Sequence, residues 1–240
     1  MNVPRLQDLK IKIFSDGADL DSIIEARQRG IVKGFTTNPT LMAKAGVTNY
    51  LMFAREVLRI VTDLPVSFEV FSDDFDEMRK QAEVLDGLAP NVYVKIPITN
   101  TKGASACPLI GELSARGTKL NITAMMTLQQ VRDVAAVLAP ESSAFISVFA
   151  GRIADSGRDP LPVMREAMEI LRPTPRAELL WASPREALNI LQAEWIGCPI
   201  ITVTPDLLAK AANFGKDLDA FSLDTVKMFY NDAQKSGFSI

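Results

Sequence analysis

A lysine within an apolar segment is the residue with the clearest chemical potential in this chain. Lys95 lies in Val92–Pro97, an otherwise hydrophobic run that ends at a proline. Burial disfavours the charged ammonium form of a lysine. A neutral amine can attack a ketone and form a Schiff base, and the protonated imine withdraws electrons while an adjacent carbon–carbon bond breaks. The alternative is a lysine that reaches solvent or forms a structural ion pair with Glu69.

Two carboxylic acids could move the protons that this chemistry requires. The chain has no histidine, which excludes Ser-His and Cys-His nucleophile pairs and leaves Asp, Glu, Lys, Tyr, Cys or water for proton transfer. Asp16 follows an apolar run, and Glu69 and Lys95 each lie near the carboxyl end of one. For Asp16 the sequence leaves open an alternative role as a helix N-cap, and for Asp19 the N-cap is the preferred interpretation.

Two arginines and a serine indicate an anion site. Arg152 and Arg185 carry guanidinium groups suited to phosphate. Ser183 precedes a predicted helix at Pro184–Trp195, and free backbone N–H groups at a helix start bind anions. The alternative is a pair of surface arginines that form ion pairs with nearby acidic residues. Those acidic residues are Asp155, Asp159 and Glu186.

The elements that must position these residues alternate regularly along the chain. Eight short apolar runs predict strands, at Ile11–Phe14, Ile31–Phe35, Val66–Phe71, Val92–Ile96, Leu120–Thr123, Ala144–Ala150, Leu179–Ala182 and Ile200–Val203. Helical segments follow them, at Asp19–Arg29, Thr48–Thr62, Phe75–Leu88, Cys107–Arg116, Leu128–Leu138, Leu161–Leu171, Pro184–Trp195 and Pro205–Ala212. About 30 residues per unit is typical of a (β/α)8 barrel. We therefore predict an α/β fold, a single TIM barrel over residues 1–240 with an additional C-terminal helix from Leu218 to about Lys235.

The competing architecture is an open doubly wound sheet. That fold would place a glycine-rich phosphate loop after the first strand, and the chain contains no GxGxxG or GxxxxGK[ST] pattern. Thr127 and Ser183 are predicted helix N-caps. Pro184 and Pro205 stand where the first turn of a helix accepts proline.

A closed parallel barrel would gather polar side chains at the carboxyl ends of its strands. Those ends supply Asp16, Thr36, Thr37, Asn38, Glu69, Lys95, Asn121, Thr123, Ser147, Arg152, Ser183 and Arg185, whereas the eighth run supplies little beyond Thr202 and Thr204. Lys12 and Lys33 come before the strand ends and are expected at the opposite face, and Lys119 is expected one layer below Asn121.

Composition excludes several other classes of protein. The net charge of −3 makes sequence-independent nucleic-acid binding a poor expectation. Two cysteines are too few for a disulfide framework or a structural zinc site. No apolar run reaches the length of a membrane span, and the first ten residues lack a signal-peptide core. We expect a protein of the cytoplasm that binds no membrane.

At these positions the sequence resembles the transaldolase family, particularly its short branch that includes fructose-6-phosphate aldolase. The resemblance runs from Asp16 to the C-terminal segment. Two matching motifs are close to diagnostic, Thr-Thr-Asn-Pro at Thr36–Pro39 and Val-Lys-Ile-Pro at Val94–Pro97. The others are Phe14–Asp19, Ser67–Val70, Leu120–Ala124, Ile146–Asp155 and Ala182–Arg185.

The resemblance implies a Schiff-base aldolase barrel that uses neither a metal nor a cofactor. It assigns Lys95 as the Schiff-base lysine and Asp16 as the acid–base group at the breaking bond. It assigns Glu69, with Thr123 and a bound water, to proton relay during imine formation. The implied substrate contacts are Asn38, Asn121 and Ser147 for the dihydroxyacetone hydroxyls, Arg152, Ser183 and Arg185 for the phosphate, and Thr36 in support.

Two positions bear on the branch of the family. Aldolase members carry Gln in place of Glu69 and Tyr in place of Phe149, so this chain resembles a transaldolase that retains the dihydroxyacetone fragment. It departs from the family at Val148, which replaces a proline, and at Pro184, which replaces an aromatic residue. These departures leave the identity of the anionic sugar open.

The resulting expectation is transfer of dihydroxyacetone from sedoheptulose 7-phosphate or fructose 6-phosphate to glyceraldehyde 3-phosphate or erythrose 4-phosphate, as in the pentose phosphate pathway. The alternatives are an aldolase that releases dihydroxyacetone, a transaldolase for another anionic sugar, and a non-catalytic sugar-phosphate binder. The resemblance also implies a homo-oligomer, often a decamer, joined through residues 218–240 with Met228, Phe229 and Tyr230 as contacts.

Overall fold

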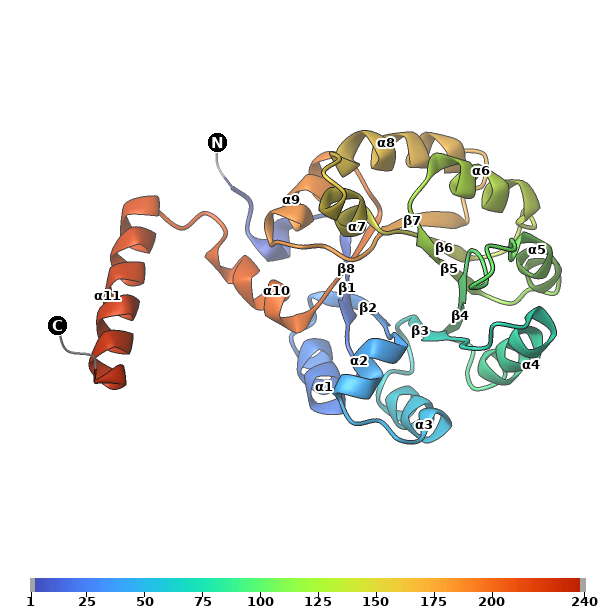
Figure 1. Cartoon of the computed structure of the whole chain (residues 1–240), viewed down its shortest axis with the longest axis horizontal. Coiled ribbons are helices and arrows are strands. Elements are labelled where there is room, and N and C mark those ends of the chain that lie inside the picture. The colour runs from blue at the N-terminus through green and yellow to red at the C-terminus, as the bar shows by residue number, and fades with distance from the viewer. Residues whose placement is uncertain (1–2, 238–240) are drawn as a thin grey trace.

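Eight parallel strands close into a barrel in the computed structural model, which describes residues 3–237 (Figure 1). Each strand pairs with its neighbours in chain order, and β1 pairs with β8. The strands are β1 (Lys12–Asp16), β2 (Val32–Thr36), β3 (Val66–Glu69), β4 (Val92–Pro97), β5 (Leu120–Met125), β6 (Ala144–Val148), β7 (Ala177–Trp181) and β8 (Ile200–Val203). The predicted (β/α)8 barrel is therefore confirmed.

Helices surround the barrel, except for the last one, α11. They are α1 (Leu20–Gln28), α2 (Pro39–Lys44), α3 (Tyr50–Ile60), α4 (Phe75–Asp86), α5 (Cys107–Ala115), α6 (Leu128–Val137), α7 (Ala150–Asp155), α8 (Pro160–Leu171), α9 (Leu188–Trp195), α10 (Pro205–Lys210) and α11 (Leu218–Ser236). Short 3₁₀ turns occupy Leu6–Asp8 and Ala211–Asn213. The short helices α2 (Pro39–Lys44) and α7 (Ala150–Asp155) were not predicted.

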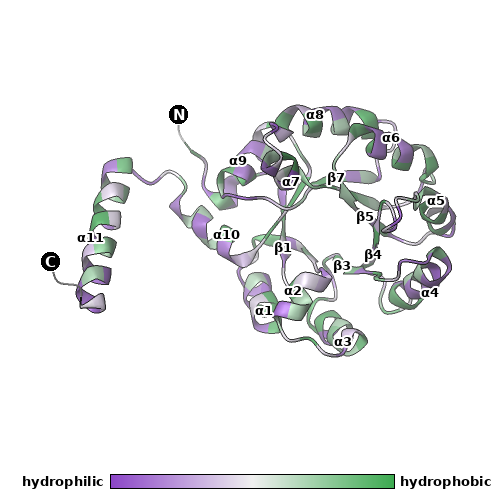
Figure 2. Ribbon diagram, viewed as in Figure 1, coloured by the Kyte–Doolittle hydropathy of each residue, from purple (hydrophilic) through white to green (hydrophobic). Residues whose placement is uncertain are grey.

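Side chains of the barrel strands point alternately outward and inward. One set of positions faces the surrounding helices and forms the main apolar core. The other set faces the barrel axis, where Phe14, Phe145, Leu180 and Ile200 pack together with Tyr93. Figure 2 shows hydrophobic residues along the barrel strands and hydrophilic residues on parts of the outer helices.

Gly34 on β2 makes room for this inner packing. A Cβ at this position would lie 2.6–2.8 Å from three atoms of the Phe14 ring. The ring of Phe14 packs edge-on against that of Phe145, with 5.3 Å between the ring centres. The ring of Phe145 stacks on that of Tyr93, with 4.0 Å between the ring centres. Absence of a side chain at Gly34 thus allows aromatic residues to fill the lower part of the barrel.

Two helix N-caps agree with prediction. The Asp19 carboxylate accepts from Ser22 N–H, and Thr127 forms a capping box with Gln130. Pro205 occupies the first turn of α10, also as predicted.

The prediction of a helix over Pro184–Trp195 was wrong at its start, because α9 begins at Leu188. Ser183 is therefore not its N-cap, and Pro184 is not in its first turn. Ser183 has a positive φ of 59°. The Asn189 side chain accepts hydrogen bonds from the backbone N–H groups of Arg185 and Glu186, which holds this segment as a loop.

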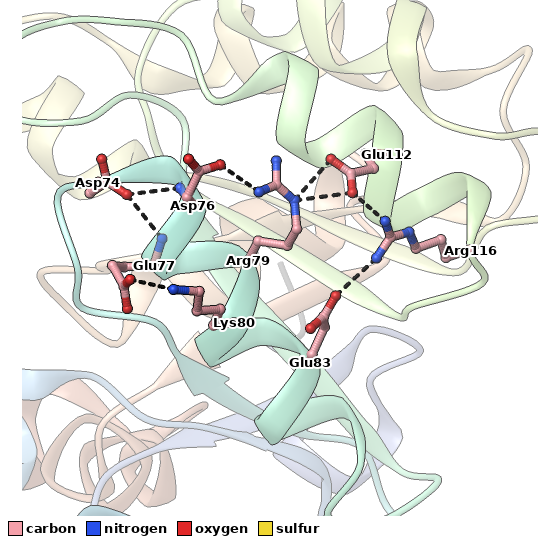
Figure 3. A network of polar contacts seen from close by, with 8 residues as sticks. All are labelled: Asp74, Asp76, Glu77, Arg79, Lys80, Glu83, Glu112 and Arg116. Carbon is pink, nitrogen blue, oxygen red and sulfur yellow. Dashed lines mark hydrogen bonds and ion pairs between the residues drawn. The ribbon is translucent and has the colours of Figure 1, made fainter.

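An alternating charge network joins α4 and α5 on the barrel exterior (Figure 3). Arg79 bridges Asp76 and Glu112, and Arg116 bridges Glu112 and Glu83. These pairs are far from fully buried, so each contributes little alone. Their effect is to tie neighbouring helices of the outer layer together.

Helix α11 lies apart from the barrel (Figure 1). None of its residues from Leu218 to Ser236 is buried, and it exposes Leu218, Phe221, Leu223, Val226, Met228, Phe229 and Tyr230. The last three residues of the segment predicted to join subunits, 238–240, lie outside the described part of the chain. Across residues 3–237, no helix has both the length and the apolar character needed to cross a bilayer.

Candidate active site

Lys95 lies at the centre of the barrel's carboxyl end. Its side chain is 9% exposed, and Nζ lies 3.0 Å from the Glu69 carboxylate. The same Nζ donates a hydrogen bond to the Thr37 carbonyl at 3.0 Å. Glu69, Lys95 and Asn121 are register neighbours on β3, β4 and β5. The ion pair that the sequence left open is therefore present, and it places a proton acceptor directly beside the amine.

Asp16 faces the same space from β1 and does not cap a helix. Its carboxylate accepts hydrogen bonds from the Thr36 hydroxyl at 2.8 Å and from the Asn38 amide at 3.5 Å. Burial raises the pKa of Asp16, while the nearby Lys95 charge and these two hydrogen bonds oppose that rise. This carboxyl consequently holds a proton more readily than an exposed aspartate does.

Thr202 supports Asp16 through Thr36. The two threonine hydroxyls lie 2.6 Å apart, and both residues are buried. Because Thr36 has one hydroxyl proton and uses it toward the carboxylate, Thr202 is the donor to Thr36. The eighth strand was expected to contribute little, although Thr202 has the same inward alternation as the other site residues.

Asn38 has two roles at the start of α2. Its side-chain oxygen accepts from Leu41 N–H and caps the helix, which leaves its NH₂ group directed at Asp16. The backbone of Asn38 has the extended conformation usual for an N-cap. The unpredicted helix α2 therefore fixes the orientation of a predicted site residue.

A buried chain of hydrogen bonds crosses the floor of the site. Ser147 Oγ donates to Asn121 Oδ1 at 2.6 Å, and Asn121 Nδ2 donates to Ser67 Oγ at 2.9 Å. Ser67 was missed by sequence reasoning, although it lies two residues before Glu69 and so faces the same side of β3. The chain fixes the amide orientation of Asn121 beside Lys95.

Thr123 is buried in the site with an unused hydroxyl. Its Oγ1 makes no hydrogen bond to any group in residues 3–237. A buried polar atom of this kind is normally satisfied by a ligand or a water molecule. The next residue, Ala124, has a positive φ of 63°, where the β5–β6 register is interrupted. This local irregularity lies at the cavity wall.

The anion-site residues lie at the opposite side of the opening. Arg152 on α7 lies over the Phe149 ring, with 5.9 Å from the guanidinium carbon to the ring centre. Arg185 donates to the Ser183 hydroxyl at 3.0 Å and pairs with Asp155. The alternative that Arg185 forms an ion pair with Asp155 is therefore realised. The predicted helix N-terminus at Ser183 is not, since Asn189 already occupies the neighbouring N–H groups.

A glycine allows the two segments that carry Arg152 and Arg185 to meet. A Cβ on Gly151 would lie 1.6 Å from the Ser183 carbonyl oxygen. No side chain fits in that distance, so α7 contacts the loop after β7 backbone to backbone. This contact brings Arg152 and Arg185 to one side of the opening.

These groups line one cavity of about 440 Å³. All twelve predicted site residues contribute to its wall, namely Asp16, Thr36, Asn38, Glu69, Lys95, Asn121, Thr123, Ser147, Phe149, Arg152, Ser183 and Arg185. Pro39, Thr40, Leu41, Ala124, Ala182, Pro184, Thr202 and Thr204 complete it. One end thus holds an amine between carboxylates, and the other holds two arginines.

Residues 13–240 match the family model described as transaldolase/fructose-6-phosphate aldolase. The chain belongs to this family. A relative from Chelativorans sp. (strain BNC1) is 36% identical, with 90% of this chain and 97% of the relative covered. A relative from Thermoanaerobacter sp. (strain X514) is 33% identical, with 96% of this chain and 100% of the relative covered. Both are described as probable transaldolases, so the cavity belongs to a transaldolase-family enzyme.

Solved structures support the fold alone. A putative phosphonomutase from Burkholderia cenocepacia J2315 aligns with a TM-score of 0.56 at 12% identity, over 97% of this chain and 96% of that one. A putative dihydrodipicolinate synthase family protein from Coccidioides immitis aligns with a TM-score of 0.59 at 10% identity, over 83% of this chain and 68% of that one. At such identities the shared barrel carries no functional conclusion.

Proposed function

We propose that this enzyme transfers a dihydroxyacetone unit from a ketose phosphate to an aldose phosphate through a Schiff base on Lys95. The observation that carries the proposal is the buried Lys95 amine, 3.0 Å from Glu69 and in one cavity with Asp16. The donor would be sedoheptulose 7-phosphate or fructose 6-phosphate. The acceptor would be glyceraldehyde 3-phosphate or erythrose 4-phosphate.

Imine formation uses Lys95 and Glu69. The ammonium proton passes to the Glu69 carboxylate, and the freed Nζ attacks the donor ketone to form a carbinolamine. Glu69 returns a proton to the carbinolamine hydroxyl, which leaves as water. The unpartnered Thr123 hydroxyl supports this role, because it can hold a water molecule in the relay.

Bond cleavage uses Asp16. Its carboxylate removes the proton from the donor hydroxyl beside the breaking carbon–carbon bond, and the electrons move into the protonated imine. The aldose phosphate leaves, and an enamine remains on Lys95. The acceptor aldehyde is then attacked by this enamine, and Asp16 returns its proton to the new alkoxide. Water finally hydrolyses the imine and releases the new ketose.

Substrate orientation follows the two ends of the cavity. Asn38, Asn121 and Ser147 would hold the hydroxyls of the three-carbon unit near Lys95. Arg152, Ser183 and Arg185 would hold the phosphate, with the guanidinium groups supplying charge-assisted hydrogen bonds. Thr36 supports Asp16, as its 2.8 Å hydrogen bond indicates.

Reductive trapping tests this proposal directly. Borohydride added with fructose 6-phosphate should reduce the imine and attach a dihydroxyacetone-derived or hexose-derived mass to the peptide that contains Lys95. Mass spectrometry of the digested protein locates the adduct. An unmodified Lys95 peptide under turnover conditions, or sugar-phosphate binding without any turnover, would contradict the proposal and favour a non-catalytic binder.

The second candidate is an aldolase that releases free dihydroxyacetone. Glu69 and Phe149 favour the transferase, because the family's aldolases carry Gln and Tyr there. Fructose 6-phosphate cleavage should therefore be slow without an acceptor and much faster with glyceraldehyde 3-phosphate. The Phe149→Tyr variant should raise the acceptor-independent rate, and equal wild-type rates with and without acceptor would favour the aldolase.

We also propose that α11 joins copies of this chain. Its exposed apolar residues, including Phe229 and Tyr230, support an interface. Removal of residues 218–240 should lower the oligomer mass measured by light scattering, and an unchanged mass would contradict the interface. A cytoplasmic location is proposed on the two buried, unpaired cysteines, Cys107 and Cys198.

A further inference from the structure

The two arginines at the anion end of the cavity differ in their partners. Arg152 lies over Phe149 and forms no direct ion pair within residues 3–237, although its positive charge also helps to lower the pKa of Asp155. Arg185 is held through all three of its guanidinium nitrogens. Its Nε donates to both Asp155 oxygens at 2.9 and 3.0 Å, Nη2 also pairs with Asp155, and Nη1 donates to Ser183 Oγ at 3.0 Å.

A carboxylate beside an anion site needs a physical explanation. Asp155 is an exposed residue, and the Arg185 hydrogen bond is the main reason that its pKa is lowered. It therefore stays ionised and cancels one of the two positive charges. In a site that only needed to attract phosphate, this negative charge would be unfavourable.

Orientation explains the carboxylate. Asp155 engages the Nε and Nη2 edge of the Arg185 guanidinium, which leaves Nη1 beside Ser183 at the cavity wall. The bidentate geometry restricts rotation of a long side chain. A free arginine loses that rotational freedom when it binds phosphate, whereas a fixed one has lost it already.

Helix α7 determines the positions of both Arg152 and Arg185. Arg152 and Asp155 are three residues apart and so share one face of the helix. Gly151 fixes the distance between this helix and the loop that carries Arg185, through its contact with Ser183. The same short helix thus presents one arginine directly and orients the other through a carboxylate.

We propose that Asp155 is a positioning residue for anion recognition, which holds the Arg185 guanidinium so that Nη1 and Ser183 face the phosphate group of the substrate. The substrate class rests on the proposed function. The role itself does not require turnover, because any phosphate monoanion or dianion in the cavity would depend on the same orientation.

Binding of inorganic phosphate tests the role without catalysis. Asp155→Ala should weaken phosphate binding to the full-length protein by about tenfold in calorimetry. Asp155→Asn should weaken it less, because the amide oxygen can still accept from Nε. Glu141→Ala is the matched control, since it frees Arg176 from a comparable exposed pair at 2.8 Å and should leave phosphate binding unchanged.

A double-mutant cycle tests whether Asp155 acts through Arg185. In an Arg185→Met background, Asp155→Ala should cause no further loss of phosphate affinity. An equal loss in both backgrounds would overturn the proposal. Tighter phosphate binding by Asp155→Ala would also overturn it, because the carboxylate would then be a competitor for Arg185.

Kinetics separate this inference from the proposed function. Asp155→Ala should raise KM for fructose 6-phosphate by about tenfold with little change in kcat. With an unphosphorylated ketose donor, kcat/KM should be the same for the variant and the wild type. A similar loss with both donors would contradict the positioning role. If the wild type binds phosphate but never turns over, the proposed function fails while the phosphate test still decides the role of Asp155.

Discussion

The mouth and the lower part of the barrel are formed by the same strands. Their inward-facing residues are only two positions apart along each strand, yet the mouth is polar and the lower part is aromatic. On β1, β4 and β6 the inward residues change from Phe14, Tyr93 and Phe145 to Asp16, Lys95 and Ser147. The aromatic set packs at ring-centre distances of 4.0 and 5.3 Å. The polar set surrounds a cavity of about 440 Å³.

This difference separates stability from chemistry within one barrel. The lower layer excludes water and supplies buried apolar area. The mouth places charged groups in partial burial, and the raised pKa of Asp16 shows that its ionised form is disfavoured there. Because side chains alternate along a strand, the residues of both layers point into the barrel. The position of a residue along its strand decides whether it belongs to the lower layer or to the mouth. Substitutions at matched positions in the two layers should therefore have different consequences.

The largest expected effect is loss of turnover in Lys95→Met. Without the amine no imine forms, so transaldolase activity should fall by about 10³-fold or more. Lys12→Met removes an inward lysine of the lower layer, which pairs with Glu178, and should leave turnover unchanged. Steady-state assays of both variants compare the layers, and an active Lys95→Met protein would contradict the proposed mechanism.

Truncation of the lower layer should mainly affect folding. Phe145 is buried between Phe14 and Tyr93, so Phe145→Ala should lower the free energy of unfolding by about 3–5 kcal/mol. Urea titration measures this change. Phe71→Ala, at a side chain that is 61% exposed, should lower it far less. Equal losses at the two positions would mean that the inner aromatic packing contributes no special stability.

Overpacking the same layer should give a smaller loss. Gly34→Ala would push a methyl group against the Phe14 ring, at 2.6–2.8 Å before relaxation. We expect a loss of about 1–3 kcal/mol in the free energy of unfolding. Gly17→Ala is the control, because its Cβ would meet nothing within 4 Å. Comparable urea midpoints for the two variants would show that Phe14 moves away without cost.

The smallest expected effect is a gain of stability in Asp16→Asn at neutral pH. Because burial raises the pKa of Asp16, the folded protein keeps this proton at pH values where the unfolded chain releases it. Wild-type stability from this group therefore falls as pH rises through that window. The advantage of the variant in thermal unfolding should be largest near neutral pH and should vanish on acidification below the ordinary aspartate pKa.

Asp19→Asn should show the opposite sign. Hydrogen bonds from Ser22 lower the pKa of Asp19, so the wild type gains stability above the ordinary value and loses it as pH falls. Asparagine still caps the helix, which isolates the charge. The same pH dependence in both variants would mean that burial does not govern Asp16.

Much of the barrel was predictable because its signals are local. Apolar runs of four to seven residues predicted all eight strands within a few residues, and polar residues at their ends predicted the wall of the cavity. The helix over Pro184–Trp195 was placed four residues early, because Asn189 and the positive φ of Ser183 hold the preceding loop. Pattern alone cannot show such a side-chain contact.

The amino-acid sequence by itself determined the barrel, the identity of the inward polar residues and the presence of an amine among carboxylates, since periodicity and residue type are local properties. Only the tertiary structure decided that Lys95 pairs with Glu69, that Thr202 and Ser67 join the site, and that Asp155 holds Arg185. These contacts join residues that are 26 to 166 positions apart. Closure of the sheet brings them within hydrogen-bond distance, and no local pattern records that closure.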